Sequence, residues 1–220
     1  MTGLNIRSLR HKKILIGFDM KLLIAVPTQD YIHYKFARSL LWLAVKLAKS
    51  GIDFDVDFRA NALVYDSREK LAAKARLEGF DEVLWLDSDM VFDADLYEKL
   101  SEHDKDFVTA VCHSRRKPFM SCVFSRLTPD AERYKAKAYP NELFRIAGAG
   151  FACVLTKVKL LREIKMKHGN LFMPSTAFGE DLSFCVKATQ CGFDLWADPT
   201  VRPGHIGHVE ITADDEIVGD

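Results

Sequence analysis

Short apolar runs alternate with amphipathic stretches through the first half of the chain. Residues 21–26 (KLLIAV) are almost entirely apolar and stop at Pro27, a pattern typical of a buried parallel strand. Residues 34–51 place apolar side chains at helical spacing and end at a glycine, as a helix would. Residues 52–58 (IDFDVDF) alternate apolar and acidic positions, which indicates a half-buried strand.

The alternation of strand and helix patterns continues to residue 112. Residues 66–79 are predicted to form a helix, with Asp66 and Glu69 placed like a capping box at its start. The elements expected next are a strand at 82–87, a helix at 94–103 and a strand at 106–112. Strands that alternate with helices in this way predict a doubly wound parallel sheet.

The second half of the chain has a different pattern. Short strand candidates lie at 120–126, 142–148 and 151–156. Helical stretches follow at 157–167 and 180–192. No internal repeat divides the chain, and no linker rich in Gly, Pro or Ser does so. The pattern therefore favours one α/β domain with two unlike halves.

The two ends of the chain are expected to lie outside the core. The first strand has a natural beginning at Met20, so residues 1–19 are interpreted as an extension. The alternative is that residues 11–18 (HKKILIGF) form an edge strand. Residues 210–220 are acidic and are expected to form a tail.

Composition narrows the class of protein. The chain has 31 basic and 31 acidic residues, which argues against a broad nucleic-acid-binding face. Its five cysteines form no CxxC pair and are expected to be reduced thiols. No window approaches the ~18 consecutive apolar residues of a membrane helix, and no secretory signal is recognisable. We therefore expect a cytoplasmic protein without a transmembrane segment.

Two aspartates follow the most apolar predicted strand, in the stretch EVLWLDSDMVFD (82–93). Asp87 and Asp89 fall at the carboxyl end of this strand, where ligands bind in open parallel sheets. Two carboxylates suit Mg²⁺ or Mn²⁺, and these ions suit a diphosphate. The alternative interpretation is a solvated turn.

The residues EVLWLDSDMV resemble the DxD motif of GT-A glycosyltransferases, in which a metal ion bridges the carboxylates and a nucleotide-sugar diphosphate. They also satisfy the first motif of haloacid-dehalogenase-like phosphatases, in which Asp87 would be the phosphoryl-accepting nucleophile. At least two strand–helix units precede the motif here. This position favours the glycosyltransferase.

Residues 177–208 resemble the C-terminal half of the same glycosyltransferases. Glu180 and Asp181 match an acidic pair that opens an acceptor-side helix, and in inverting members this Asp is the general base. In HIGH, His205 first and His208 second match the histidine region that supplies a further metal ligand. The acceptor loop is matched by GAGF, that is, by Gly148, Ala149 and Gly150 before Phe151.

The first half of the chain completes the resemblance, which runs in order from residue 21 to about 209. The residues it implies for nucleotide-sugar binding are Pro27, Thr28, Asp57, Arg68, Asp87 and Ser88. Asp57 stands in for an acidic pair that often recognises uracil in this family and that this sequence lacks. The basic run 113–118 (HSRRKP) is a further candidate for phosphate contact, although a solvated loop is the simpler interpretation.

The resemblance implies a single-domain GT-A (Rossmann-like) fold over residues 20–209. The expected architecture is a mostly parallel central sheet flanked by helices, with a smaller mixed β region in the C-terminal half. The implied activity is a Mn²⁺- or Mg²⁺-dependent transfer of a sugar from a nucleotide-sugar, most simply a UDP-sugar, to an acceptor hydroxyl with inversion. The acceptor could be a glycan, a lipid-linked sugar, a protein or a modified base. A retaining transferase and a non-catalytic nucleotide-sugar binder remain alternatives.

Overall fold

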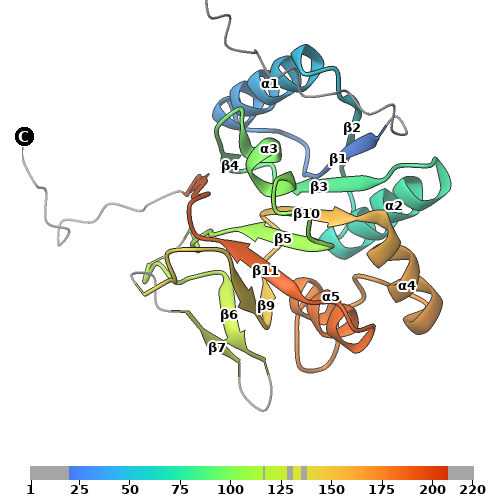
Figure 1. The fold of residues 1–220 in the computed structure, drawn as a ribbon, viewed down its shortest axis with the longest axis vertical. Coiled ribbons are helices and arrows are strands. Elements are labelled where there is room, and N and C mark those ends of the chain that lie inside the picture. Colours follow the sequence, from blue (N-terminus) through green and yellow to red (C-terminus); the bar gives the residue numbers. More distant parts are fainter. Residues whose placement is uncertain (1–19, 116, 128–130, 135–137, 208–220) are drawn as a thin grey trace, which may run out of the picture.

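The computed structural model describes residues 20–115, 117–127, 131–134 and 138–207. The expected N-terminal extension, the acidic tail and His208 all lie outside these residues. Within them, a seven-stranded sheet runs through the centre of the molecule, and helices cover both of its faces (Figure 1). The predicted α/β architecture is confirmed.

The central sheet joins strands from both halves of the chain. In spatial order its strands are β2 (Asp53–Arg59), β1 (Lys21–Pro27), β3 (Glu82–Leu86), β10 (Cys153–Lys157), β5 (Phe107–Ala110), β11 (Leu195–Asp198) and β8 (Phe144–Ile146). All strands except β10 and β8 point the same way, so the expected mostly parallel sheet is confirmed.

Strand β10 enters the sheet between β3 and β5 and is antiparallel to both. Sequence periodicity did not predict this insertion, because β10 comes from the second half of the chain. Trp85 on β3 is fully buried, and its Nε1–H donates to Thr156 Oγ1 at 2.9 Å. This bond joins the two strands beneath the DxD residues.

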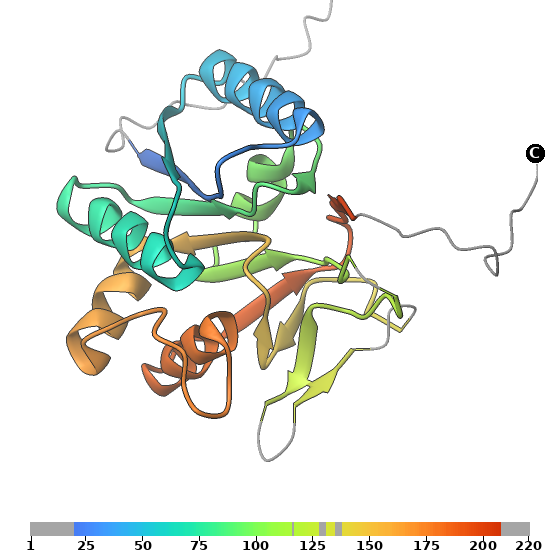
Figure 2. The same ribbon diagram turned by 180° about the vertical axis from the view of Figure 1, so that it is seen from behind.

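Alternate residues of the strands pack on two separate helical layers. Leu22, Ile24 and Val26 face helices α1 and α3, whereas Leu23 and Ala25 face the layer of α2, α4 and α5. Figures 1 and 2 show these two layers from opposite sides. The helices span α1 (Tyr34–Lys49), α2 (Val64–Leu77), α3 (Leu96–Ser101), α4 (Val158–His168) and α5 (Glu180–Gln190).

Two small antiparallel sheets flank the central one. The first consists of β4 (Met90–Val91) and β12 (Gly204–His205), and the second of β7 (Glu132–Arg133), β6 (Val123–Arg126) and β9 (Gly148–Ala149). The second sheet is the smaller β region that was expected in the C-terminal half, and its pairings are antiparallel instead of mixed.

The predicted capping box of helix α2 is wrong. The helix begins two residues before Asp66, at Val64, and its N-cap Leu63 makes no side-chain capping bond. Glu69 instead accepts hydrogen bonds from two backbone N–H groups near the end of α4, those of Leu171 and Phe172 (2.6 Å for Phe172). A tertiary contact therefore replaces the local one.

Among the described residues, no helix combines the length and the apolar character needed to cross a lipid bilayer.

Candidate active site

The DxD residues form the tight connection between β3 and β4. The N–H of Asp87 donates to Ala152 O at 3.0 Å, which fixes the connection to the segment that precedes β10. Strand β12 pairs with β4, so that His205 lies opposite Met90, and the N–H of Ile206 donates to Asp89 O at 2.8 Å. Backbone pairing therefore brings the C-terminal histidine region beside the second aspartate.

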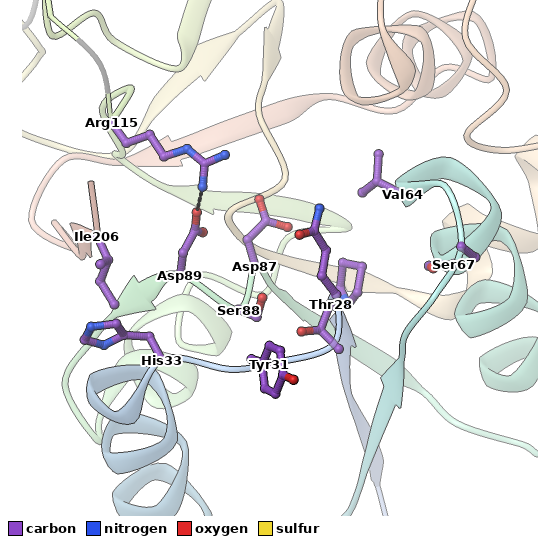
Figure 3. Close-up of a pocket in the computed structure, with 13 residues that line it drawn as sticks. Thr28, Tyr31, His33, Val64, Ser67, Asp87, Ser88, Asp89, Arg115 and Ile206 are labelled. Atoms are coloured by element: carbon purple, nitrogen blue, oxygen red, sulfur yellow. Dashed lines mark hydrogen bonds and ion pairs between the residues drawn. The ribbon is translucent and has the colours of Figure 1, made fainter. Parts of the chain in front are cut away.

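A cavity of about 420 Å³ opens above the carboxyl ends of β1 and β3 (Figure 3). Its lining includes Pro27, Thr28, Asp87 and Ser88, all of which were expected to bind the nucleotide-sugar, together with Asp89. The rest of the lining is Gln29, Tyr31, His33, Ala62, Val64, Ser67, Arg115 and Ile206. The volume lies in the range of sites that hold small molecules.

Two buried hydroxyl groups at this cavity have no hydrogen-bond partner among the described residues. They are Thr28 Oγ1, at the end of β1, and Ser67 Oγ, in the first turns of α2. A buried hydroxyl without a partner costs free energy, so each such group calls for an explanation. A polar ligand in the cavity would provide the missing partners.

The Arg68 cluster, composed of Arg68, Asp87, Glu180 and Asp181, reaches the cavity through Asp87. The Arg68 side chain is only 2% exposed, and its Nη2 donates to Asp87 Oδ1 at 2.8 Å. Its Nη1 donates to Glu180 Oε1 at 3.0 Å and forms a second ion pair with Asp181 Oδ1. One guanidinium therefore joins the first DxD aspartate to the acidic pair that opens α5.

The electrostatics of the Arg68 cluster are dominated by burial and by its excess of carboxylates. Burial raises the pKa of Asp181 to about 6, because Glu180 and Asp87 add to the effect and Arg68 offsets only part of it. Burial also raises the pKa of Asp87, again against the opposing charge of Arg68. For Arg68 itself burial acts downward, but the three carboxylates outweigh it and raise the pKa.

The expected acceptor loop lies beside Asp181 at one position. A Cβ atom added to Gly150 would lie 3.7 Å from Asp181 Oδ2 and 3.6 Å from Cys122 Cβ, so glycine keeps the space in front of the carboxylate open. Gly148 and Ala149 are buried, and they belong to strand β9. A role of these two residues in acceptor contact would be indirect.

The Asp89 cluster, composed of Asp89, Arg115 and His205, lies on the solvent side of the DxD residues. Asp89 Oδ2 pairs with Arg115 Nη1 and lies 3.3 Å from His205 Nε2 (Figure 3 shows the Arg115 contact). Burial acts to raise the pKa of Asp89, but His205 and Arg115 outweigh it and hold the pKa below its ordinary value. The hydrogen bond to Asp89 raises the pKa of His205.

The orientation of His205 tests whether the cluster suits a metal ion. His205 Nδ1 lies 2.8 Å from the backbone carbonyl oxygen of His113, which can only accept, so Nδ1 carries a proton. In the neutral imidazole, Nε2 then directs a lone pair at Asp89 Oδ2. Two acceptors that face each other require either a proton or a cation between them. Metal-binding histidines are oriented by the same kind of bond from their other ring nitrogen.

The ligand set is incomplete as it stands. Among the described residues, no group of three or more His, Cys, Asp or Glu side chains is arranged to hold a metal ion. Asp87 is held by Arg68 through Oδ1, and His208 lies outside the described part of the chain. Asp89 and His205 are therefore the residues whose chemistry fits a divalent cation, with Asp87 as the adjacent candidate.

Two residues expected to bind the nucleotide do not line the cavity. Asp57 lies on β2, where it pairs with Arg59 at 2.8 Å and with Lys74 at 3.3 Å. Arg68 lies behind Asp87 instead of facing the cavity. The structure brings Asp57 to none of the other candidate residues.

Several lining residues were not anticipated from the sequence. Tyr31 and His33 occupy the connection between β1 and α1, and Ser67 directly precedes Arg68. A connection that follows a strand at the carboxyl edge of a parallel sheet is itself a signal for ligand contact. The side chains that reach the cavity could have been sought there.

Comparison with known proteins gives a structural match without a sequence match. No model of a protein family matches the chain, and no curated protein matches it. Among solved structures, A197 from STIV is 19% identical, with a TM-score of 0.56 and coverage of 85% of each chain.

Two further solved structures share the architecture. GalNAc-T7, crystallised with UDP, GalNAc and Mn²⁺, is 13% identical with a TM-score of 0.58, and the match covers 91% of this chain and 46% of that one. The catalytic domain of Drosophila beta1,4-galactosyltransferase 7, in complex with xylobiose, is 13% identical with a TM-score of 0.51. That match covers 81% of this chain and 65% of the other.

Both of these enzymes have the fold that the DxD motif and the ordered acidic and histidine residues led us to expect. At this level of identity the likeness concerns the fold. The central sheet and its two helical layers agree with it. The chain has the GT-A fold.

Proposed function

We propose that the chain transfers a sugar from a nucleotide-sugar donor, with UDP-sugars favoured, to an acceptor hydroxyl, and that it inverts the anomeric configuration. The GT-A fold supports this proposal, as does the presence of UDP and Mn²⁺ in the GalNAc-T7 structure. The observation that carries it is the Arg68 bridge, which couples Asp87 at the donor cavity to Asp181 near the acceptor loop.

Donor binding is assigned to the cavity above β1 and β3. The unpartnered hydroxyl groups of Thr28 and Ser67 provide hydrogen-bonding capacity for the nucleotide. Arg115 lines the same cavity and can place its guanidinium on a phosphate. This role would employ the basic run 113–118 that the sequence contains.

A divalent cation, Mn²⁺ or Mg²⁺, would be held by Asp89 and His205, with Asp87 beside them. When bound, such a cation supplies positive charge to the leaving diphosphate. Asp89 is well suited to ligate it, because a low carboxyl pKa keeps this side chain ionised. His205 must release its proton to ligate through Nε2.

Acceptor activation is assigned to Asp181. Its carboxylate would take the proton of the acceptor hydroxyl while the acceptor oxygen forms a bond to the anomeric carbon. The bond from that carbon to the diphosphate oxygen breaks, and its electron pair leaves with the diphosphate. Arg68 fixes the position of Asp181, and Gly150 leaves room for the acceptor oxygen. A well-placed base contributes roughly 10²–10⁴ in rate.

The phosphatase alternative receives less support from the geometry. It requires Asp87 as a free nucleophile, whereas Asp87 Oδ1 accepts a hydrogen bond from a buried arginine. The position of the DxD residues after the third strand of a GT-A fold also favours the transferase.

Calorimetric binding of UDP and GDP, with Mn²⁺ and with EDTA, tests the proposal. We expect UDP to bind in a metal-dependent manner and binding to be lost in Asp89→Ala. Asp93→Ala is the matched control, because Asp93 follows β4, close to Asp89 along the chain, but does not line the cavity. Hydrolysis of a panel of UDP-sugars would then identify the donor, and NMR of the product would give its anomeric configuration.

The outcomes of this experiment separate the alternatives. Absence of binding by any nucleotide, with or without metal, would contradict the proposal. Metal-dependent binding without turnover of any donor, together with unchanged nucleotide binding in Asp181→Asn, would indicate the non-catalytic binder instead.

A further inference from the structure

Helix α1 packs on the sheet with its inner face, and this packing does not account for the composition of its outer face. Its buried residues include Phe36, Leu40, Leu43 and Leu47, and they pack on the sheet. The whole helix, residues 34–49, contains no acidic residue. Both ribbon views place α1 at the outside of the molecule (Figures 1 and 2). Its outer side is therefore available to a partner.

The α1 outer face carries large apolar side chains. Tyr34 is 70% exposed, Leu41 is 62% exposed and Trp42 is 55% exposed. Tyr31, in the connection before the helix, is 90% exposed. Large apolar side chains gathered on one exposed surface mark sites of protein or membrane interaction.

Basic side chains are interspersed with these apolar ones. Lys35, Arg38 and Lys49 are exposed and have no carboxylate partner among the described residues. Lys46, on the same helix, forms an ion pair with Glu98 at 2.6 Å. The α1 outer face is thus defined by six residues: Tyr34, Lys35, Arg38, Leu41, Trp42 and Lys49.

The positive charge of the α1 outer face discriminates between the partners that could bind to it. Residues 1–19 contain four basic residues and one acidic residue, so this segment would meet like charge on α1. A second copy of α1 would do the same. An anionic lipid surface has the complementary charge, and tryptophan and tyrosine favour the membrane–water interface.

We infer that the α1 outer face docks the protein peripherally on an anionic lipid bilayer. Trp42, Leu41 and Tyr34 would enter the headgroup region, while Lys35 and Arg38 would contact lipid phosphates. Tyr31 also lines the cavity, so docking would place the mouth of the cavity beside the bilayer. The inference does not rest on the proposed glycosyl transfer, because it concerns binding alone.

Sedimentation with vesicles tests the apolar part of this inference. The full chain would be mixed with phosphatidylcholine vesicles containing phosphatidylglycerol, and with vesicles of phosphatidylcholine alone. We expect binding to the anionic vesicles, and a loss of about tenfold in partitioning for Leu41→Ser/Trp42→Ser. The matched control is Leu77→Ser/Met166→Ser, which removes apolar side chains that are more exposed, at 81% and 76%.

A second pair of variants tests the charge. Lys35→Gln/Arg38→Gln should lower partitioning about tenfold, whereas Lys70→Gln/Arg162→Gln, which removes two exposed cations elsewhere, should leave it unchanged. Binding of the wild type should weaken as salt rises through physiological concentration.

The inference is overturned by three results. The first is absence of vesicle binding by the wild type, and the second is an equal loss in test and control variants. The third is a concentration-dependent dimer in gel filtration that Leu41→Ser/Trp42→Ser dissociates, because the occupant would then be a second copy. Circular dichroism of each variant establishes that it is folded.

Discussion

The Arg68 cluster and the Asp89 cluster each contain one aspartate of the DxD motif, but they differ in burial and in the balance of charge. The Arg68 cluster places three carboxylates around one guanidinium that is 2% exposed. The Asp89 cluster places one carboxylate between Arg115 and His205, and the Arg115 side chain is 52% exposed. In the Arg68 cluster, the carboxylates outnumber the one buried guanidinium, whose position is fixed. In the Asp89 cluster, Arg115 and His205 share a single carboxylate, and other cations can take their place.

This difference suggests a division of labour. A buried ion-pair network keeps its geometry, because separating any member leaves a charge without a partner in a poorly solvated place. A half-exposed pair can exchange partners at little cost. Under the proposed function, the Arg68 cluster would therefore position the base, and the Asp89 cluster would exchange cations.

Replacement of the base should separate the two clusters most strongly. Asp181→Asn is expected to lower the rate of transfer by roughly 10²–10⁴ while UDP binding with Mn²⁺ is retained, because the Asp89 cluster is intact. Steady-state rates and calorimetry measure the two effects. Asp194→Asn, in an exposed ion pair with Arg145, is the control. An equal loss of nucleotide binding would show that the clusters do not act separately.

Removal of the shared guanidinium should destabilise the fold. Arg68→Met leaves three carboxylates without their partner, at a cost of roughly 3 kcal/mol in the free energy of unfolding. Arg59→Met, which breaks a half-exposed pair with Asp57, should cost less than about 1 kcal/mol. Denaturant titration measures both.

A second substitution shows whether charge is the cause. Arg68→Met/Asp181→Asn should recover part of the lost stability, since it removes one of the unpaired carboxylates. If the double variant is less stable than Arg68→Met, packing of Arg68 against Phe151 and Phe172 is the larger contribution.

The sequence predicted all four residues of the Arg68 cluster, and Asp89 and His205 of the Asp89 cluster, but not the contacts of Arg68 that join its cluster. Asp87 and Asp89 are recognisable because an apolar strand runs directly into them, and His205 follows from the order of the motifs. The bridge by Arg68 was not foreseen, because its carboxylates come from segments 19, 112 and 113 residues away in the chain. Local patterns carry no information about such pairings, and Arg68 was expected to approach the nucleotide.

The fold shows the same limit. Strands and helices of the first half follow from hydrophobic periodicity, which depends on neighbours along the chain. The insertion of β10 between β3 and β5 depends on which strand edges remain free after both halves have formed. Glu69 likewise binds Leu171 and Phe172 instead of capping its own helix.

On the Asp89 side, His205→Gln should weaken binding of Mn²⁺ in the presence of UDP by roughly 10- to 100-fold. His103→Gln is a matched control, since His103 pairs with Asp198 at 2.7 Å in another histidine–aspartate pair that does not line the cavity. Calorimetry with Mn²⁺ measures both variants. Equal behaviour of the two variants would remove His205 from the metal site.

The rate of transfer, which depends on Asp181 in the Arg68 cluster, should fall about tenfold for each pH unit below the pKa of this residue. Because burial raises the pKa of Asp181 to about 6, the base is protonated below that pH and the rate should fall as the pH falls. The raised pKa also favours folding below the ordinary value of 3.8, and this contribution is lost as the pH rises through about 6. Asp181→Asn should therefore flatten the change in melting temperature between pH 4 and 6, whereas Asp194→Asn should not.

The smallest expected effect concerns the exchangeable cation. Arg115→Gln removes a competitor for Asp89, so Mn²⁺ alone should bind roughly two- to fivefold more tightly, the range of a half-exposed ion pair. UDP should bind more weakly to the same variant, because the guanidinium is no longer present for its phosphates. Arg145→Gln, which breaks an exposed arginine–aspartate pair outside the cavity, should change neither affinity. Weaker binding of both ligands to Arg115→Gln would mean that Arg115 organises the site instead of exchanging with the metal ion, and the contrast between the two clusters would then be lost.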